Sequence, residues 1–220
     1  QRARVLGIAF PRWKAATVRP LPSLHPSKVL FARNARAASK LAPGPMGRLV
    51  HWGNVAPVGV TALSGRSGAR TLCMGDGFIR SVGLGSDLIK PRSLVLDGRG
   101  LYLDPRHPSA LEDLLNEHQF AADELARAHD IRRLIVAEGI TKYNTQRRTR
   151  PDWADVGGAG RLVVLVPGQV EDDASIRFGC EGVSTNLGLL QAARFAHPDA
   201  FIVYKPHPDV LARNRAGAAP

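Results

Sequence analysis

Three consecutive acids follow a short apolar run in the second half of the chain. Residues 163–166 are apolar, a Pro-Gly pair interrupts the run, and Glu171, Asp172 and Asp173 come shortly afterwards. A short apolar run between turn formers indicates a buried strand of a parallel sheet. In a doubly wound α/β domain, ligands bind beyond the carboxyl ends of the strands, where a carboxylate can act as nucleophile or base. The three acids could equally cap the following turn or bind a cation.

A lysine and a histidine follow the next predicted strand. Residues 186–196 show helical spacing, residues 201–204 have a strand pattern, and Lys205 and His207 come directly after it. This βαβ unit makes the two strands neighbours, so Asp173 and His207 should line the same crevice. An ammonium group and an imidazole N–H suit a phosphate, although a histidine between two prolines is also a common rigid loop residue. A carboxylate opposite a leaving phosphate indicates glycosyl transfer through an oxocarbenium-like state.

The first half of the chain has the pattern of a Rossmann-like domain. Short apolar runs alternate with connections of helix or loop size, which is typical of α/β proteins. A Pro-rich segment at residues 13–27 and a Gly- and Ser-rich segment after residue 52 are predicted to be irregular. The predicted elements are strands at residues 5–10, 29–31, 49–52 and 70–74 and a helix at residues 35–41.

A glycine-rich segment follows the fourth of these strands. Its glycines, within residues 75–87, do not have GxGxxG spacing, so the segment is no dinucleotide fingerprint. Strands at residues 93–96 and 101–103 are predicted to form a hairpin around an Asp-Gly turn signal. A capping-box pattern at Ser109 and the helical spacing beyond it predict a helical segment over residues 109–139.

The composition predicts a folded protein with an anionic partner. The 220 residues are 44% hydrophobic and carry a formal net charge of +11, which favours nucleic acid, a phosphorylated or carboxylated sugar, or an acidic membrane face as partner. Cys73 and Cys180 lack metal-site or disulfide spacing, and we expect both to be buried thiols in a reducing compartment. No apolar run approaches the roughly 20 residues that span a bilayer, and the N-terminal run is too short for a secretory signal. A cytoplasmic location is therefore expected.

Two domains are predicted, and the second is expected to be incomplete. Residues 1–155 would form the first, Rossmann-like domain, with the helical segment 109–139 and a polar, basic connector at 142–155. Residues 156–220 would begin a second Rossmann-like domain. One βαβ unit cannot complete a doubly wound domain, so the C-terminal part of this fold is expected to be missing from the chain.

Three collinear stretches carry a resemblance to a known family. They are GDGFIRSVGLGSDLIKPRSLVLDGRGLYLDP, VPGQVEDDASIRFG with TNLGLL, and PDAFIVYKPHPDVLARNR. Together they resemble the bacterial capsule polysaccharide Kdo transferases, from about residue 71 to residue 215, and most resemble the second transferase module of those proteins. The resemblance implies a GT-B-like α/β fold, with two Rossmann-like domains flanking a cleft. It also implies a retaining transfer of β-Kdo from CMP-Kdo to a lipid-linked Kdo acceptor.

The resemblance also assigns roles to residues. It implies that Asp173 is the nucleophile, that Asp76, in an Asp-Gly motif, orients or deprotonates the acceptor, and that His207 stabilises the departing CMP. The family usually has an acid just before that Asp-Gly motif, where this chain has Gly75. We expect no metal, and no cofactor besides the CMP-Kdo donor substrate. Further substrate-binding candidates are Lys205, Gln169, Ser175, Arg80, Ser81, Glu171 and Asp172.

The implied partners are anionic. They are CMP-Kdo, a lipid-linked glycan acceptor, the cytoplasmic face of the inner membrane and the capsule assembly and export machinery. A non-catalytic component of capsule assembly or export is an alternative interpretation. A basic nucleic-acid-binding module is another, based on the net charge and on the QRRTR run at residues 146–150. No helix-turn-helix, zinc-finger or RNP-like motif supports it, and aromatic residues are only 6%, so no nucleic-acid partner is expected.

Overall fold

The computed structural model describes residues 4–19, 28–145 and 157–217. Residue contacts divide the chain into two compact units, Gln1–Asn144 and Thr145–Pro220, which are described separately below. The domain boundary predicted after residue 155 and most of the predicted connector 142–155 lie outside the described residues.

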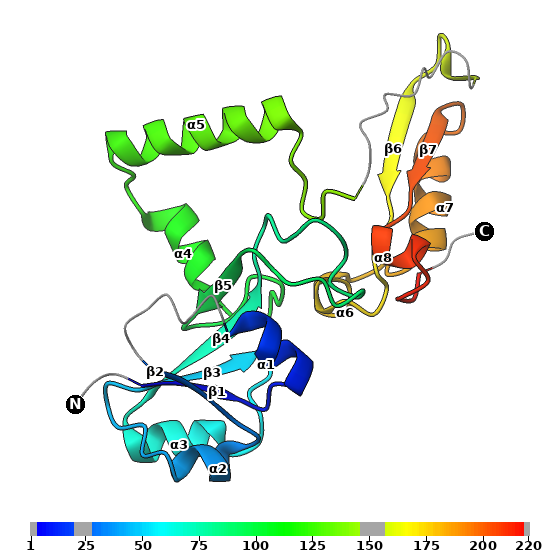
Figure 1. Ribbon diagram of the computed structural model, residues 1–220. Helices are drawn as coiled ribbons and strands as arrows, with labels where there is room; N and C mark the ends of the chain where they lie inside the picture. Colours follow the sequence, from blue (N-terminus) through cyan, green and yellow to red (C-terminus); the bar gives the residue numbers. More distant parts are fainter. Residues whose placement is uncertain (1–3, 20–27, 146–156, 218–220) are drawn as a thin grey trace. The chain divides into compact units, whose positions relative to one another are not determined.

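The first unit is built on a five-stranded sheet (Figure 1). Four strands run parallel, and the strand at one edge, β5, is antiparallel to its neighbour β4. The order β2-β1-β3-β4-β5 is that of a doubly wound sheet, with its topological switch point between β1 and β3. The strands are β1 (Arg4–Ile8), β2 (Lys28–Ala32), β3 (Arg48–Trp52), β4 (Arg70–Asp76) and β5 (Leu94–Asp97).

Helices cover both faces of this sheet. The helix α1 (Arg12–Val18) packs on one face, and α2 (Ala35–Ser39) and α3 (Val60–Ser67) pack on the other (Figure 1). Leu49 and Val50, consecutive in β3, are 0% and 1% exposed because their side chains enter the two opposite cores. Burying each such side chain contributes about 1.5–3 kcal/mol, and the two-sided cover accounts for the continuous apolar runs of the strands.

Two helices form where irregular structure was predicted. The Pro-rich segment contains α1, which begins directly after Pro11 and buries Ala15 and Val18 against the sheet. The Gly- and Ser-rich segment contains α3, which is bounded by Gly59 and Gly68, both with positive φ (82° and 68°). For the described residues of these segments the prediction was wrong, because proline and glycine mark the ends of these helices rather than an absence of structure. Residues 20–27 of the Pro-rich segment lie outside the described residues.

The predicted hairpin at residues 93–103 is also wrong. The strand β5 pairs with β4, in the register Met74↔Leu96, and residues 101–103 form no strand. The turn itself is present, because Oδ1 of Asp97 accepts hydrogen bonds from the backbone N–H groups of Arg99 (2.7 Å) and Gly100 (3.1 Å). The signal for a turn was correct, but the chain leaves it toward the helical segment instead of folding back.

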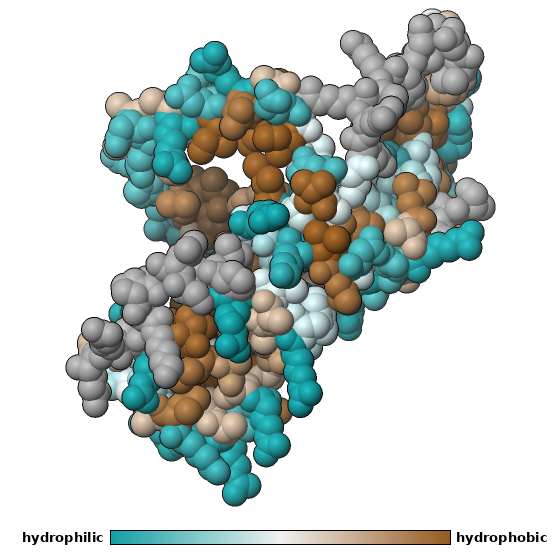
Figure 2. Space-filling model, viewed as in Figure 1, coloured by the Kyte–Doolittle hydropathy of each residue, from teal (hydrophilic) through white to brown (hydrophobic). Residues whose placement is uncertain are grey.

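The helical segment predicted at residues 109–139 is confirmed as two helices. In α4 (Ala110–Glu117), Oγ of Ser109 caps the backbone N–H of Glu112 at 3.1 Å, and α5 (Ala122–Glu138) ends at Gly139 with φ of 54°. Figure 2 shows apolar side chains at the surface over these helices. The exposed apolar residues of the two helices include Leu114, Leu115, Leu125, Ile131, Leu134 and Val136.

The second unit is a βαβ unit, as predicted. The strands β6 (Val163–Pro167) and β7 (Phe201–Lys205) are parallel neighbours, and α7 (Asn186–Ala196) lies between them in sequence. Two short helices that were not predicted, α6 (Ala174–Gly179) and α8 (Pro208–Leu211), follow the carboxyl ends of the strands (Figure 1). The strand β6 is only partly buried, because Leu165 is 58% exposed whereas Val166 is 3% exposed.

The two cysteines differ in burial. Both are free thiols, and Cys73 is buried in β4, as predicted. Cys180 is exposed, which corrects the prediction, because it ends the short helix α6 at the surface. Among the described residues, no helix has both the length and the apolar character needed to cross a membrane.

Candidate active site

Two of the predicted acids have clear structural partners in the loop after β6. Asp173 is the N-cap of α6, where its Oδ1 accepts hydrogen bonds from the backbone N–H (3.0 Å) and the hydroxyl (2.8 Å) of Ser175. Asp172 is exposed, and its Oδ1 lies 2.8 Å from Nη2 of Arg215. The capping role left open in the sequence is therefore real for Asp173, but the cap occupies only one of its two carboxylate oxygens.

The third acid belongs to a network centred on Asn186, the first residue of α7. The Asn186 side chain is 4% exposed; it accepts from the backbone N–H of Gln169 (2.8 Å) and donates to the carbonyls of Gln169 (2.8 Å) and Gly217 (2.7 Å). Its backbone N–H donates to Oε1 of Glu171 at 2.8 Å. Asn186 thus holds both Gln169 and Glu171, the two ends of the segment that precedes Asp173. Its place in the TNLGLL stretch was the only sequence signal for this role.

His207 caps the helix that follows it through one of its two ring nitrogens. It is the N-cap of α8, where Nδ1 accepts a hydrogen bond from the backbone N–H of Asp209 at 3.1 Å. We assign the proton of the neutral imidazole to Nε2 on this basis, so Nε2 is a donor. Oδ2 of Asp209 lies 3.7 Å from Nδ1 and would form an ion pair with a protonated ring.

The strand register brings these groups to one edge of the second unit. Pro167 and Lys205 are partners at the ends of β6 and β7, and the backbone N–H of Gly168 donates to the carbonyl of Lys205 at 2.8 Å. The loops that carry Asp173 and His207 therefore leave the sheet side by side at its carboxyl edge. Lys205 and Gln169 are exposed there. A carboxylate, an imidazole N–H and an ammonium group at one edge can together bind an anion and attack an electrophilic carbon.

Asp76 ends β4 in the first unit. Its Oδ1 lies 3.0 Å from Nε of Arg80, an ion pair without the alignment of a hydrogen bond. The Asp76 side chain is 29% exposed, whereas that of Arg80 is 3% exposed. The Asp76 side chain is therefore partly accessible, although its Oδ1 is buried against the Arg80 guanidinium.

Arg80 and Ser81 are buried and organise the loop after β4. Nη1 of Arg80 donates to Oγ of Ser81 (2.9 Å) and to the carbonyl of Ile89 (2.9 Å), and the Ser81 hydroxyl donates to the carbonyl of Gly83 (2.7 Å). Both backbone N–H groups donate to the carbonyl of Lys142. The predicted role of these two side chains in substrate binding remains a prediction, because their observed contacts are internal.

The two glycines that flank Asp76 are packed to different degrees. A Cβ on Gly77 would lie 2.1 Å from Oγ of Ser93, so only glycine fits at that position. A Cβ on Gly75 would lie 3.1 Å from Cδ1 of Leu101. A side chain at position 75, where the family that this chain resembles usually has an acid, would therefore require Leu101 to shift by a few tenths of an ångström.

Lys14 and Trp52 are further candidates that the sequence analysis missed. Nζ of Lys14, on α1, lies 3.5 Å from the centroid of a Trp52 ring at the end of β3. Burial lowers the pKa of Lys14; the charge of Asp76 opposes this shift and that of Arg80 adds to it. Lys14 was missed because its segment was predicted to be irregular, although the apolar residues Ala15 and Val18, three positions apart, fit one face of a helix.

A family model covers most of the chain. Residues 48–218 match the model described as "Capsule polysaccharide biosynthesis protein". The chain belongs to the capsule polysaccharide biosynthesis family. LipA of Neisseria meningitidis serogroup A, a capsule polysaccharide modification protein, is 35% identical over 218 residues, which are 98% of this chain and 30% of LipA. LpsZ of Rhizobium meliloti, a lipopolysaccharide-processing protein, is 42% identical over 147 residues, 64% of this chain and 32% of LpsZ.

Two solved structures of the transferase KpsC are similar to this chain over nearly its whole length. A Thermosulfurimonas dismutans KpsC structure titled as a β-Kdo 2,7 transferase is 31% identical with a TM-score of 0.63, over 94% of this chain and 62% of that one. A second, titled as a β-Kdo 2,4 transferase, is 27% identical with a TM-score of 0.77, over 98% and 64%. The resemblance to capsule Kdo transferases and the α/β fold class are thereby confirmed. The chain spans about a third of the length of these curated relatives and less than two thirds of the length of the solved chains.

Proposed function

We propose that this chain forms part of a retaining glycosyltransferase that moves β-Kdo from CMP-Kdo to an anionic, lipid-linked glycan. The observation that carries the proposal is the register of β6 and β7, because it brings Asp173, Lys205 and His207 to one edge of the second unit. Family membership and the likeness to KpsC structures support the same chemistry. The proposed acceptor would place the reaction at the cytoplasmic face of the inner membrane, beside the capsule assembly and export machinery.

Two displacements at the anomeric carbon account for retention. The free carboxylate oxygen of Asp173 attacks this carbon, and the bond to the CMP phosphate breaks with its electron pair passing to the phosphate oxygen. The Nε2–H of His207 and the ammonium group of Lys205 stabilise the charge that develops there. The acceptor hydroxyl then displaces Asp173 and loses its proton to a base, a role we assign to Asp76.

The nucleophile can be tested without disturbing the fold. Asp173→Asn keeps an oxygen that can cap α6, because Asn and Asp are equally good N-caps, but it removes the nucleophilic carboxylate. We expect Kdo transfer by the intact protein to fall by at least roughly a thousandfold. Mass spectrometry after incubation with CMP-Kdo should show Kdo attached to the peptide that contains Asp173, and no adduct in the variant.

Asp172→Asn is the matched control. It removes a neighbouring carboxylate whose exposed ion pair with Arg215 is worth at most about 1 kcal/mol. We expect less than a threefold loss of transfer. Equal losses in the two variants, or an adduct on another peptide, would reject Asp173 as the nucleophile.

A further inference from the structure

The positive charge of the chain is concentrated in one segment. Residues 1–75 contain 12 Lys and Arg and no Asp or Glu, whereas the remaining residues contain 18 Lys and Arg and 19 Asp and Glu. The whole surplus of +11 therefore comes from the segment that ends at β4, and Asp76 is the first acid in the chain. Such a segment attracts anions over distances beyond direct contact.

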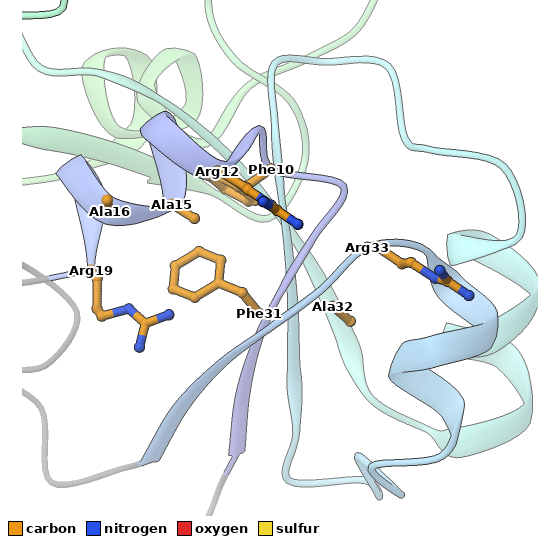
Figure 3. A pocket seen from close by; sticks show the side chains of 8 residues that line it. All are labelled: Phe10, Arg12, Ala15, Ala16, Arg19, Phe31, Ala32 and Arg33. Atoms are coloured by element: carbon orange, nitrogen blue, oxygen red, sulfur yellow. The ribbon is translucent and has the colours of Figure 1, made fainter.

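The described residues that line a pocket in this segment include three arginines and no acid. The pocket has a volume of about 470 Å³ and lies between α1 and the carboxyl ends of β1 and β2 (Figure 3). This volume is within the range of small-ligand sites. Within the described residues, neither Arg12 nor Arg33 forms an ion pair. The lining residues are Phe10, Arg12, Ala15, Ala16, Arg19, Phe31, Ala32 and Arg33.

A row of aromatic rings connects this pocket with the region of Asp76. The Phe10 ring lies 5.4 Å from that of Phe31 and 6.3 Å from that of Trp52, both edge to face. Cations lie over the two ends of the row, with the Arg19 guanidinium 5.1 Å from the Phe31 ring and Lys14 Nζ 3.5 Å from the Trp52 ring. The row follows the carboxyl edge of the sheet from β3 across β1 to β2, and β3 is the neighbour of β4.

The separation of the pocket from Asp76 limits the size of the ligand. The strands β4 and β2 are three strand spacings apart in the sheet, which is about 14 Å. This distance is longer than one sugar residue. A ligand that reaches from Asp76 to the pocket must therefore be an extended molecule, with an anionic group at a distance from its reacting end.

We propose that the arginine pocket binds a carboxylate or phosphate of the acceptor at a point more than one sugar residue from the hydroxyl that reacts. Guanidinium groups bind both anions through paired hydrogen bonds, and the aromatic row supports the apolar faces of the intervening part. The identity of the ligand as acceptor rests on the proposed transferase function. The capacity of the pocket to bind an anion does not.

The test compares two double variants of the intact protein that lose the same charge. Arg12→Gln with Arg33→Gln removes two cations of the pocket, and Arg36→Gln with Arg66→Gln removes two exposed cations on α2 and α3, on the opposite face of the sheet. With an acceptor that carries a distal anionic group, we expect the pocket variant to raise the acceptor KM at least tenfold and to leave the KM for CMP-Kdo within twofold. The control variant should change the acceptor KM less than threefold.

The source of the anion is resolved by the acceptor. Two further acceptors are compared, one without the distal carboxylates and one without the lipid phosphate. The rise in acceptor KM caused by the pocket variant should disappear with the acceptor that lacks the group bound in the pocket. Equal increases in KM in the two double variants would overturn the proposal, because net charge alone would then explain them.

A binding measurement separates this proposal from the proposed function. Isothermal titration with inorganic phosphate at low ionic strength should show binding to the intact protein and to the control variant, but at least tenfold weaker binding to the pocket variant. This result would support the pocket even if Kdo transfer were absent. Unchanged phosphate binding in the pocket variant would overturn the proposal. The proposal would also be overturned if the pocket variant lost binding to a single-stranded oligonucleotide while its acceptor KM stayed unchanged.

Discussion

At the residue scale, the three acids after β6 do different things in spite of their adjacency. Glu171 accepts from the start of α7, Asp172 pairs with Arg215 at the surface, and Asp173 caps α6. A cap holds the carboxylate in a fixed direction through one oxygen, which is how a nucleophile is preorganised. Structural and chemical roles are therefore compatible in Asp173, and this is why the variant must preserve the cap.

His207 is expected to act through Nε2. His207→Asn keeps a side-chain acceptor that can cap α8 but removes the donor that, in the proposed function, stabilises the leaving phosphate. The loss of one such donor costs roughly a hundredfold in kcat. Steady-state kinetics of transfer should show this loss. His197→Asn, an exposed histidine at the end of α7 in the same unit, should leave kcat unchanged, and similar kcat values for the two variants would remove His207 from the mechanism.

Asp104 predicts a pH dependence of stability in the first unit. Its side chain is 2% exposed, and hydrogen bonds from Nε (2.8 Å) and Nη2 (2.7 Å) of Arg106 lower its pKa to about 2. In the unfolded chain this pKa is about 3.9. The contribution of the carboxylate is thus complete above about pH 4 and is lost as the pH falls toward 2.

The unfolding temperature measured across this pH range tests the assignment. The Asp104→Asn variant should be less stable than the parent at pH 7, and its unfolding temperature should fall less than that of the parent between pH 4 and 2. Asp130→Asn, at a position whose side chain is 74% exposed, should keep the pH dependence of the parent. A parallel decline in all three proteins would contradict the lowered pKa of Asp104.

At the element scale, the segment after β6 is positioned by its contacts with α7 and β7. Asn186 ties Gln169 to α7 and to Gly217, and Gly168 packs against β7. A Cβ on Gly168 would lie 2.5 Å from Oη of Tyr204, so the junction between the strand end and the segment before Asp173 needs glycine at this point. The geometry of Asp173 thus depends on residues of α7 and β7 that lie outside its own segment.

Asn186→Ala should therefore destabilise the second unit. It removes three side-chain hydrogen bonds and leaves the backbone groups of Gln169 and the carbonyl of Gly217 without this partner. Each unsatisfied buried group costs about 1–3 kcal/mol, and we expect a total loss of about 2–4 kcal/mol in the free energy of unfolding. Denaturant titration of the intact protein measures this loss. Gln191→Ala, at an exposed position of α7, should change the value by less than about 0.5 kcal/mol, and an equally small change in Asn186→Ala would refute the network.

At the scale of the whole molecule, charge is divided along the chain. The segment up to β4 holds the entire positive surplus, and the rest of the chain is close to neutral. The acidic cluster after β6 therefore belongs to the nearly neutral part of a chain whose net charge is +11. It also makes the first unit the natural site for a polyanionic ligand.

Acceptor use should consequently depend strongly on salt. Raising the ionic strength from about 0.1 M to 1 M shortens the screening length from roughly 10 Å to 3 Å, so long-range attraction of an anionic acceptor is largely lost. We expect the acceptor KM to rise about tenfold over this range while kcat stays within twofold. An acceptor with its anionic groups neutralised should show no such rise, and a salt-independent KM for the anionic acceptor would exclude steering by the basic segment.

The patterns that could be read from the sequence were those that depend on neighbours along the chain. The strands β1 to β4, the βαβ unit, the cap at Ser109 and the end of α5 at Gly139 follow from apolar period and cap chemistry, which are local properties. The placement of Asp173 and His207 beyond adjacent strand ends also followed, because parallel strands in a βαβ unit end at the same edge. The helices α1 and α3 were missed because the prediction gave more weight to the prolines and glycines of these segments than to the spacing of their apolar residues.

The sequence by itself determined the α/β class, the acidic and His-Pro motifs, and the order of the strands that carry them. Only the tertiary structure decided that Arg80 and Ser81 are buried, that Asn186 holds the segment before Asp173, and that Lys14 lies over Trp52. It also decided that Phe10 and Phe31 join three arginines in one pocket. The physical reason is that these contacts link residues far apart in the chain. Strand register and helix crossovers set such contacts, and the local pattern around either partner does not record them.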